Sequence, residues 1–141
     1  MTLSIAFASS DRESVDQHFG AAAAFAIYEI GAEGARLREV AEFIDTEQDG
    51  HEGKLDAKIA LLDGCAAVYA CAIGSSAVQR LLAKGVQPLR VADGSPIEAL
   101  LARLCAELAG TPPVWLAKAI DLRERRSPDR FDAMAAEGWE E

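Results

Sequence analysis

The chain has 141 residues, half of them hydrophobic, and a formal net charge of -9. This length fits one compact domain with a substantial core. The acidic balance disfavours broad nucleic-acid binding, which depends on clustered Lys and Arg. No apolar run approaches the roughly 20 residues that cross a bilayer, and the first residues lack the pattern of a secretion signal. We therefore expect a cytoplasmic protein that binds neither nucleic acid nor membrane.

The three cysteines, Cys65, Cys71 and Cys105, are an odd number and have no CxxC spacing. Their count argues against a disulfide framework and against a structural zinc site, so we expect reduced thiols. Cys105 lies in a leucine-rich stretch and is expected in the core, whereas Cys65 follows a glycine and is expected to be partly accessible.

The first part of the chain predicts three strands. Residues 2–8 alternate large apolar with small side chains, which is typical of a strand. Residues 24–30 and a third stretch through Phe43 flank a glycine-containing turn at 31–34, and we expect them to form a hairpin.

Helices and strands are expected to alternate in the rest of the chain. Residues 45–53 are polar and acidic, and we interpret them as a mobile surface loop with an exposed His51. The apolar spacing then predicts a helix from Leu55 closed by Gly64, a strand over 66–72, a helix from Gly74 to Gly85, a strand over 86–92, a helix with Ser95 as N-cap and Pro96 at its first position, and a short helix beginning within 111–116.

Three strands followed by alternating helices and strands predict an α/β domain whose mixed sheet is covered by helices. We place this domain at residues 1–122. Residues 123–141 mix charge runs with few apolar residues, and we expect them to form a frayed tail.

The segment Val15–Gly20, VDQHFG, places one of the two histidines in a loop soon after the first strand. We expect Phe19 to insert into the core and so fix the loop, and Gly20 to supply a backbone path closed to other residues. The imidazole of His18 would then face outward as a ligand. Asp16 could hydrogen-bond the loop backbone or orient the imidazole, and the sequence does not choose between these roles.

Cys71 is expected at the end of the central strand, just before Gly74, Ser75 and Ser76 open the next helix. Ligands of open α/β sheets bind at the carboxyl ends of strands, and helix N-termini favour anions. Gly74, Ser75 and Ser76 therefore form a candidate anion-binding cradle. The lysine and the glycine spacing of a Walker motif are missing.

One histidine with one or two thiols suits soft transition metals or iron-sulfur clusters. The candidate metal ligands are His18, Cys65 and Cys71, which are too few for a closed four-ligand site. We therefore favour a preassembled cluster held by one or two exchangeable bonds. An anionic cluster on an acidic chain needs local N–H donors or a basic side chain such as Arg80.

The sequence offers no recognisable combination of a nucleophile, a base and an orienting group. We therefore expect no catalytic activity. The predicted strands carry almost no carboxylates, which argues against a metal-dependent nuclease. The candidate residues for cofactor binding are His18, Phe19, Gly20, Cys71, Gly74, Ser75 and Ser76.

Five segments, taken in order, resemble nitrogenase accessory proteins of the dinitrogenase iron-molybdenum cofactor-binding family: IAFASSD, VDQHFG, FAIYEI, KLDAKIALLDGCAAVYACAIGSSAVQRLL and TPPVWLAKAI. The resemblance extends to about Ile120. Its most specific parts are HFG and GCxAVYxxAIG. The larger relatives with an additional N-terminal domain are not matched, so we expect a stand-alone core domain that is a monomer or weak oligomer.

The resemblance implies a ribonuclease H-like α/β fold with a mixed five-stranded sheet and no nuclease activity. It also implies that the protein binds the iron-molybdenum cofactor or its iron-sulfur precursor and passes it from a precursor donor to a scaffold acceptor. By position, His18 becomes the cluster ligand and Cys65 the motif cysteine, with Cys71 as a second thiol nearby. The vanadium system stays open as an alternative to the molybdenum system.

A second hypothesis keeps the same fold but assigns it to protein interaction or regulation. Aromatic residues near the end of the chain, Trp115, Phe131 and Trp139, stand among charged residues and suit contacts with a partner.

Overall fold

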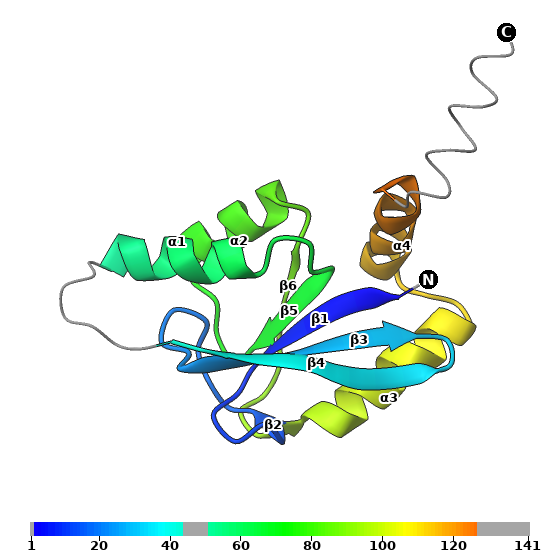
Figure 1. The fold of residues 1–141 in the computed structure, drawn as a ribbon, viewed down its shortest axis with the longest axis horizontal. Helices are drawn as coiled ribbons and strands as arrows, with labels where there is room; N and C mark the ends of the chain where they lie inside the picture. Colours follow the sequence, from blue (N-terminus) through cyan, green and yellow to red (C-terminus); the bar gives the residue numbers. More distant parts are fainter. Residues whose placement is uncertain (1, 44–50, 127–141) are drawn as a thin grey trace, which may run out of the picture.

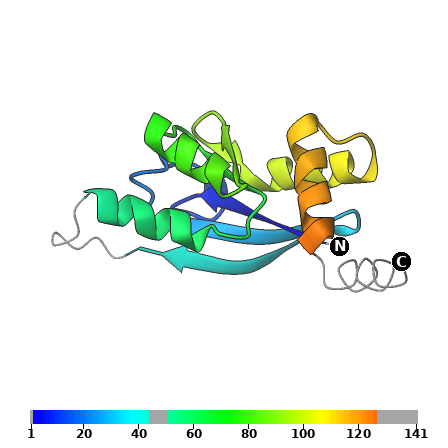
Figure 2. The same ribbon diagram turned by 90° about the horizontal axis from the view of Figure 1, so that it is seen from above.

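The computed structural model describes residues 2–43 and 51–126, which form three layers. One sheet lies between two pairs of helices (Figures 1 and 2). Helices α1 (His51–Leu61) and α2 (Ser75–Ala83) cover one face, and α3 (Ile97–Ala109) and α4 (Val114–Arg126) cover the other. None of the helices in the described ranges is long and apolar enough to cross a membrane.

The main sheet contains β1 (Leu3–Ala8), β3 (Ala24–Gly31), β4 (Gly34–Glu42), β5 (Ala67–Ala70) and β6 (Gln87–Arg90), in the order β4-β3-β1-β5-β6. The β3–β4 hairpin continues antiparallel onto β1, whereas β1, β5 and β6 run parallel. This arrangement confirms the predicted mixed five-stranded sheet of an α/β domain.

The alternation in β1 divides the core into two halves. Leu3, Ile5 and Phe7 pack under α3 and α4, and the small residues Ala6 and Ala8 pack under α1 and α2. Successive side chains of a strand point to opposite faces, so a strand at the centre of a three-layer fold is apolar on both sides. The small side chains leave room for Phe19 and Phe25, which are fully buried on the α1 and α2 side.

A second sheet of two short strands, β2 (Ser14–Val15) and β7 (Ser95–Pro96), was not predicted. The predicted N-cap of α3 was wrong for this reason. Pro96, with an extended backbone, occupies the cap position, and the Ser95 hydroxyl donates to the carbonyl oxygen of Ala92 at 2.6 Å. Pairing with a segment some 80 residues away in sequence keeps these residues extended, and local patterns carry no signal for such a contact.

Two predicted boundaries also change. Helix α1 already begins at His51, so the last residues of the predicted loop 45–53 are helical, while 45–50 lie outside the described residues together with the side chain of His51. The predicted short helix runs from Val114 through Arg126 and crosses the boundary expected at residue 122. The rest of the predicted tail, 127–141, lies outside the described residues as well.

Candidate functional site

The segment Val15–Gly20 lies across the carboxyl end of β5. The backbone N–H of Cys71 donates to the carbonyl oxygen of Gln17 at 2.9 Å, and the N–H of Phe19 donates to the carbonyl oxygen of Ala72 at 2.8 Å. The loop is therefore paired with the chain that leaves β5. This pairing brings His18 and Cys71, far apart in sequence, to one end of the sheet.

Phe19 anchors this loop as expected. Its side chain is fully buried, and its ring centroid lies 5.5 Å from that of Phe25. The preceding residue, His18, is exposed. The loop turns at these residues, where the N–H groups of Ala21 and Ala22 donate to the carbonyl oxygens of His18 and Phe19 at 3.2 and 3.3 Å. The turn leaves the imidazole outside while the phenyl ring enters the core.

The expected role of Gly20 is wrong. Its backbone is not in the left-handed region, and an added Cβ would meet nothing within 4 Å. The structure uses the carbonyl oxygen of Gly20, which accepts a hydrogen bond from Lys58 Nζ at 2.7 Å. The same ammonium group lies 5.4 Å from the centroid of the Phe43 ring. A different residue at position 20 could supply this carbonyl equally well.

Asp16 holds the loop backbone rather than the imidazole. Its carboxylate accepts hydrogen bonds from the backbone N–H of Ser10, at 2.9 Å, and from the Ser10 hydroxyl. The neighbouring carboxylate of Asp11 accepts the N–H groups of Glu13 and Ser14, both at 2.9 Å, and these bonds lower its pKa to about 2. The turn between β1 and β2 is thus organised by two carboxylates. Because the pKa of Asp11 is lowered on folding, its contribution to stability is present above about pH 4 and is lost as the pH falls toward 2.

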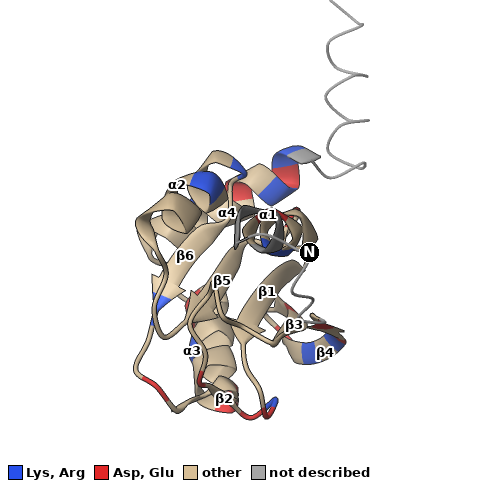
Figure 3. Ribbon diagram, turned by 90° about the vertical axis from the view of Figure 1, so that its left-hand side faces the viewer, with Lys and Arg blue, Asp and Glu red and all other residues tan. Residues whose placement is uncertain are grey.

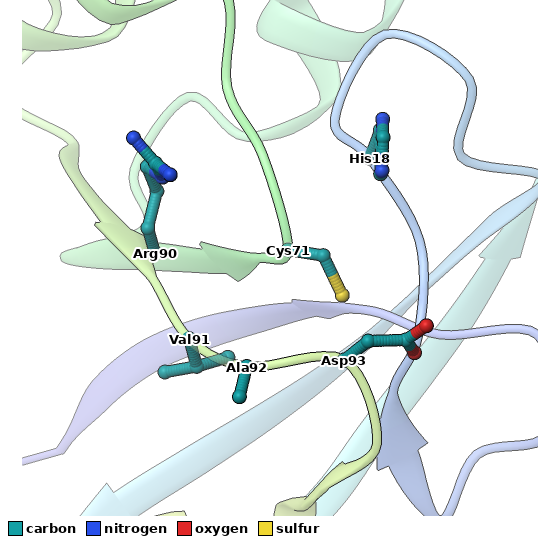
Figure 4. A pocket seen from close by; sticks show the side chains of 6 residues that line it. All are labelled: His18, Cys71, Arg90, Val91, Ala92 and Asp93. Carbon is teal, nitrogen blue, oxygen red and sulfur yellow. The ribbon is translucent and has the colours of Figure 1, made fainter.

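An open cleft of about 600 Å³ lies at the carboxyl ends of β5 and β6 (Figure 4). It is lined by His18, Cys71, Arg90, Val91, Ala92 and Asp93. In Figure 4 the side chain of Cys71 lies between Arg90 on one side and His18 on the other. Residues from three separate segments thus converge where open α/β sheets usually bind ligands.

Cys71 is partly buried, and its Sγ donates to the carbonyl oxygen of Val15 at 3.3 Å. Burial, together with the carboxylates of Asp93 and Asp16, raises the pKa of this thiol, and the N–H of Gly94 opposes the rise. The resting form is therefore a protonated thiol. A metal bound here would replace the proton and release the sulfur from the Val15 carbonyl.

Cys65 does not join His18 and Cys71. It precedes β5 whereas Cys71 follows it, and the chain between the two cysteines, at about 3.3 Å per residue, extends over up to roughly 20 Å. Cys65 was expected to be partly accessible but is only 6% exposed, packed among residues of α1 and β5. Burial raises the pKa of its thiol to about 11.

This environment predicts that Cys65 is the least reactive thiol of the native protein. Under native conditions iodoacetamide should alkylate Cys71 and Cys105, which are partly exposed, at least about 10-fold faster than Cys65, because only the accessible thiolate reacts. Peptide mass spectrometry of timed samples measures the three rates, and a urea-unfolded sample, in which the rates should converge, is the control. Equal rates in the native protein would contradict the buried position of Cys65.

Among the residues predicted for the site, only His18 and Cys71 line the cleft. Phe19 and Gly20 support the loop from behind. Gly74 is the N-cap of α2, where it has no side chain to form a capping hydrogen bond. Ser75 and Ser76 lie in the first turn of this helix and are exposed. The predicted anion cradle exists as a helix start but does not belong to the lining of the cleft.

Arg90 was missed by the sequence reasoning. It is the last residue of β6 and is exposed on the cleft, and it forms no ion pair within the part of the chain that the structure describes. Arg80, the basic residue named from the sequence, instead pairs with Asp56. The available signal was a basic residue near the end of a predicted parallel strand, where ligand-binding residues gather.

The donor set of the cleft is small. Within residues 2–43 and 51–126 no group of three or more His, Cys, Asp or Glu side chains is placed to hold a metal ion. The cleft can therefore offer one imidazole and one thiol as soft or borderline ligands, with one guanidinium beside them.

The fold and the cleft define a three-layer α/β domain that presents an imidazole, a thiol and a guanidinium at the ends of two parallel strands. Residues 1–107 match the family model described as dinitrogenase iron-molybdenum cofactor, and the chain belongs to this family. The resemblance derived from the sequence motifs is thereby confirmed.

Three relatives show how much of this chain, and how much of each relative, is covered by the similarity. The chain is 57% identical to protein NifX of Azotobacter vinelandii, over 99% of this chain and 88% of that protein. It is 36% identical to protein NifX of Rhodobacter capsulatus, over 87% and 80%. It is also 35% identical to the FeMo cofactor biosynthesis protein NifB of Frankia alni, over 77% of this chain and 23% of NifB.

The crystal structure of PH0822 is similar to this one, with a TM-score of 0.57. The match covers 80% of this chain and 98% of PH0822, at 20% sequence identity. This likeness shows a shared fold.

Proposed function

We propose that this protein carries the iron-molybdenum cofactor, or its iron-sulfur precursor, during nitrogenase cofactor biosynthesis. Membership of the family and the names of the NifX and NifB relatives support a role in this biosynthesis. The observation that carries the proposal is the convergence of His18 and Cys71 on one open cleft at the strand ends. The protein acts as a non-catalytic cytoplasmic carrier between a precursor donor and a scaffold acceptor.

In this proposal His18 and Cys71 are the cluster ligands. A thiolate is a soft ligand that iron-sulfur material accepts, and an imidazole replaces thiolates in some iron-sulfur centres. Two protein ligands leave most of a cluster's surface uncovered. Such a cluster is exchangeable, which is what handover to another protein requires. Cys65 is left out of this ligand set because the strand β5 separates it from the other two residues.

Arg90 supplies local positive charge for an anionic cluster. The chain as a whole carries -9, but charges more than about 8 Å away are largely screened at physiological salt. The charges nearest to the cleft therefore determine whether it attracts an anionic cluster. Asp93 also lines the cleft, so the guanidinium of Arg90 offsets a carboxylate as well as attracting the cargo.

The proposal is tested by anaerobic mixing of the full chain with isolated cofactor, and separately with the precursor cluster, followed by gel filtration. Iron that elutes with the protein, together with a changed electron paramagnetic resonance or absorption spectrum, is the expected result. Bovine serum albumin of the same concentration controls for nonspecific adsorption. Iron that elutes with neither protein would contradict the carrier function.

The charge of Arg90 gives a further prediction. Arg90→Glu should weaken cluster binding by about 10-fold or more at low salt, because it turns an attraction of roughly 1 kcal/mol into a repulsion of similar size. The loss should shrink as salt is added. Arg80→Glu is the matched control, since Arg80 does not line the cleft and is paired with Asp56. Equal losses in the two variants, measured by titration of the cluster spectrum, would exclude a specific role for Arg90.

Two finer structural assignments belong to the same proposal. The mixed sheet, with an antiparallel hairpin half and a parallel half, supports a ribonuclease H-like fold. Because α4 continues across residue 122, we place the end of the cofactor-binding domain at or beyond Arg126 rather than at 122.

A further inference from the structure

A second hollow, of about 160 Å³, lies between α2, the turn that follows it, and α4. Its walls include Leu82 and Gly85 on one side and Trp115, Lys118, Ala119 and Leu122 on the other. We call it the α2–α4 groove. The residues at the starts of β5 and β6 form its floor, whereas the cleft of His18 lies at the ends of these strands. The two sites are thus at opposite edges of the sheet.

The groove collects apolar side chains that the fold leaves exposed. Leu82 on one wall is 52% exposed, and Trp115 on the opposite wall is partly exposed. Among the described residues, the other large hydrophobic side chains that are exposed are Leu37 on β4 and Val114 at the start of α4. Two apolar side chains that remain accessible on facing walls of one hollow are suited to contact an apolar side chain of another molecule.

Helix α4 packs closely against the turn after α2 at the base of the groove. A Cβ added at Gly85 would lie 3.2 Å from Cδ2 of Leu122, which is a tight contact. The backbone of Gly85 is also in the left-handed region, at φ +80, and resists replacement. A side chain at position 85 would therefore disturb the packing at the base of the groove.

One lysine lines the groove and a second adjoins its lining residues in sequence, in a chain that is strongly acidic. Lys118 lines the hollow, and Lys84 immediately precedes Gly85. Both lysines are exposed, and neither forms an ion pair within residues 2–43 and 51–126. Helix α2 contains no acidic residue. Figure 3 shows basic residues on α2 and both basic and acidic residues on α4, and both helices lie on the upper side of the molecule in Figure 1.

We propose that the α2–α4 groove docks an acidic segment of a partner protein, which inserts one large apolar side chain between Leu82 and Trp115. A hollow of 160 Å³ holds about one such side chain. The carboxylates of the segment lie against Lys84 and Lys118. Because the groove and the cleft are at opposite edges of the sheet, the partner can bind while the cleft is filled. The docking site does not depend on the function proposed for the cleft.

The test uses short random peptides displayed on phage and selected on the immobilised full chain. The expected result is enrichment of peptides in which Asp and Glu flank a single Leu, Ile, Phe or Trp. A synthetic copy of an enriched peptide should bind Leu82→Glu and Lys118→Glu at least about 10-fold more weakly, which is the loss expected of a central contact. Leu37→Glu, a change at an equally exposed leucine on β4, is the matched control and should bind like the wild type.

The results of these experiments distinguish an acidic partner segment from other possible occupants of the groove. Peptides without acidic or apolar bias, or peptides that bind the two groove variants as well as the wild type, overturn the proposal. Sedimentation that shows a dimer of the wild type and a monomer of Leu82→Glu identifies a second copy as the occupant and also overturns it. Peptide binding that appears only after Phe131 and Trp139 are both changed to alanine identifies the chain's own residues 127–141 as the occupant, with the same consequence. Equal thermal unfolding of all variants ensures that lost binding is not lost folding.

Discussion

The His18→Ala variant is expected to bind the cluster at least about 10-fold more weakly than the wild type, with an unchanged unfolding temperature. Changing a group that merely supports a metal ligand typically costs 10-fold to 100-fold in affinity, and removing the ligand itself costs no less. The side chain of His18 is exposed, and the loop is held by the buried Phe19, so the fold does not depend on the imidazole. Anaerobic titration followed by the cluster's absorption gives the affinity, and calorimetry gives the unfolding temperature.

The chain offers a matched control in His51→Ala, which removes the other histidine. This variant should bind the cluster like the wild type. Cys71→Ala removes the second proposed ligand, and the His18→Ala, Cys71→Ala double variant should retain no binding above the background of an unrelated protein. If His18→Ala keeps its affinity while Cys71→Ala loses it, the thiol is the principal ligand and the assignment of His18 is wrong. If both single variants bind normally, the cleft is not the cluster site.

Phe19→Ala is expected to lower the free energy of unfolding by about 3–5 kcal/mol, the cost typical of deleting a buried phenyl ring. The ring is fully buried among Phe25 and residues of α1, and its loss leaves a cavity behind the loop. The loop then loses the anchor that positions His18. Urea unfolding, followed by far-ultraviolet circular dichroism, measures the change in stability.

Gly20→Ala is the control for the Phe19 variant, since it changes the next residue of the same loop. The backbone of Gly20 is not left-handed and its surroundings are open, so an alanine there should be neutral or should stabilise the protein by up to about 1 kcal/mol. A large destabilisation by Gly20→Ala would show that the loop needs glycine after all. A loss below about 1 kcal/mol in Phe19→Ala would show that the ring does not hold the loop.

The two variants also separate positioning from ligation. At a temperature where Phe19→Ala is still mostly folded, it should bind the cluster more weakly than the wild type because His18 is no longer fixed. Its affinity should recover in Phe19→Leu, which refills most of the cavity. The loss of binding in His18→Ala, in contrast, cannot be restored by refilling the core, because the imidazole is exposed and does not pack there. Failure of Phe19→Leu to restore binding would indicate that the aromatic ring has a direct role.

The elements of this fold follow closely from local sequence. The alternation of large and small residues in β1, the turn between β3 and β4 and the apolar run of β5 each depend on neighbours within a few residues. Gly64 and Gly85, predicted to end helices, both adopt left-handed backbone conformations, at φ +92 and +80. A periodic pattern of apolar residues and a glycine at a helix end both depend only on local sequence. They can therefore be recognised from one sequence.

The sequence by itself also determined the chemistry that the site could contain. It singled out His18 in its anchored loop and Cys71 at a strand end, and its motifs indicated the family to which the chain belongs. It did not determine which of these residues meet. Cys65 and Cys71 are near in sequence yet lie at opposite ends of β5, and Gly74, Ser75 and Ser76 start a helix outside the lining of the cleft.

Only the tertiary structure decided the composition of the cleft and of the groove. The parallel order of β1, β5 and β6 sets Arg90 and Asp93 beside Cys71, and the hydrogen bonds of the Val15–Gly20 loop add His18. Helix α4 folds back on the turn after α2 and creates a groove at the other edge of the sheet. Each of these contacts joins residues far apart in sequence, and which strand ends lie side by side depends on the packing of the whole sheet and not on any local pattern.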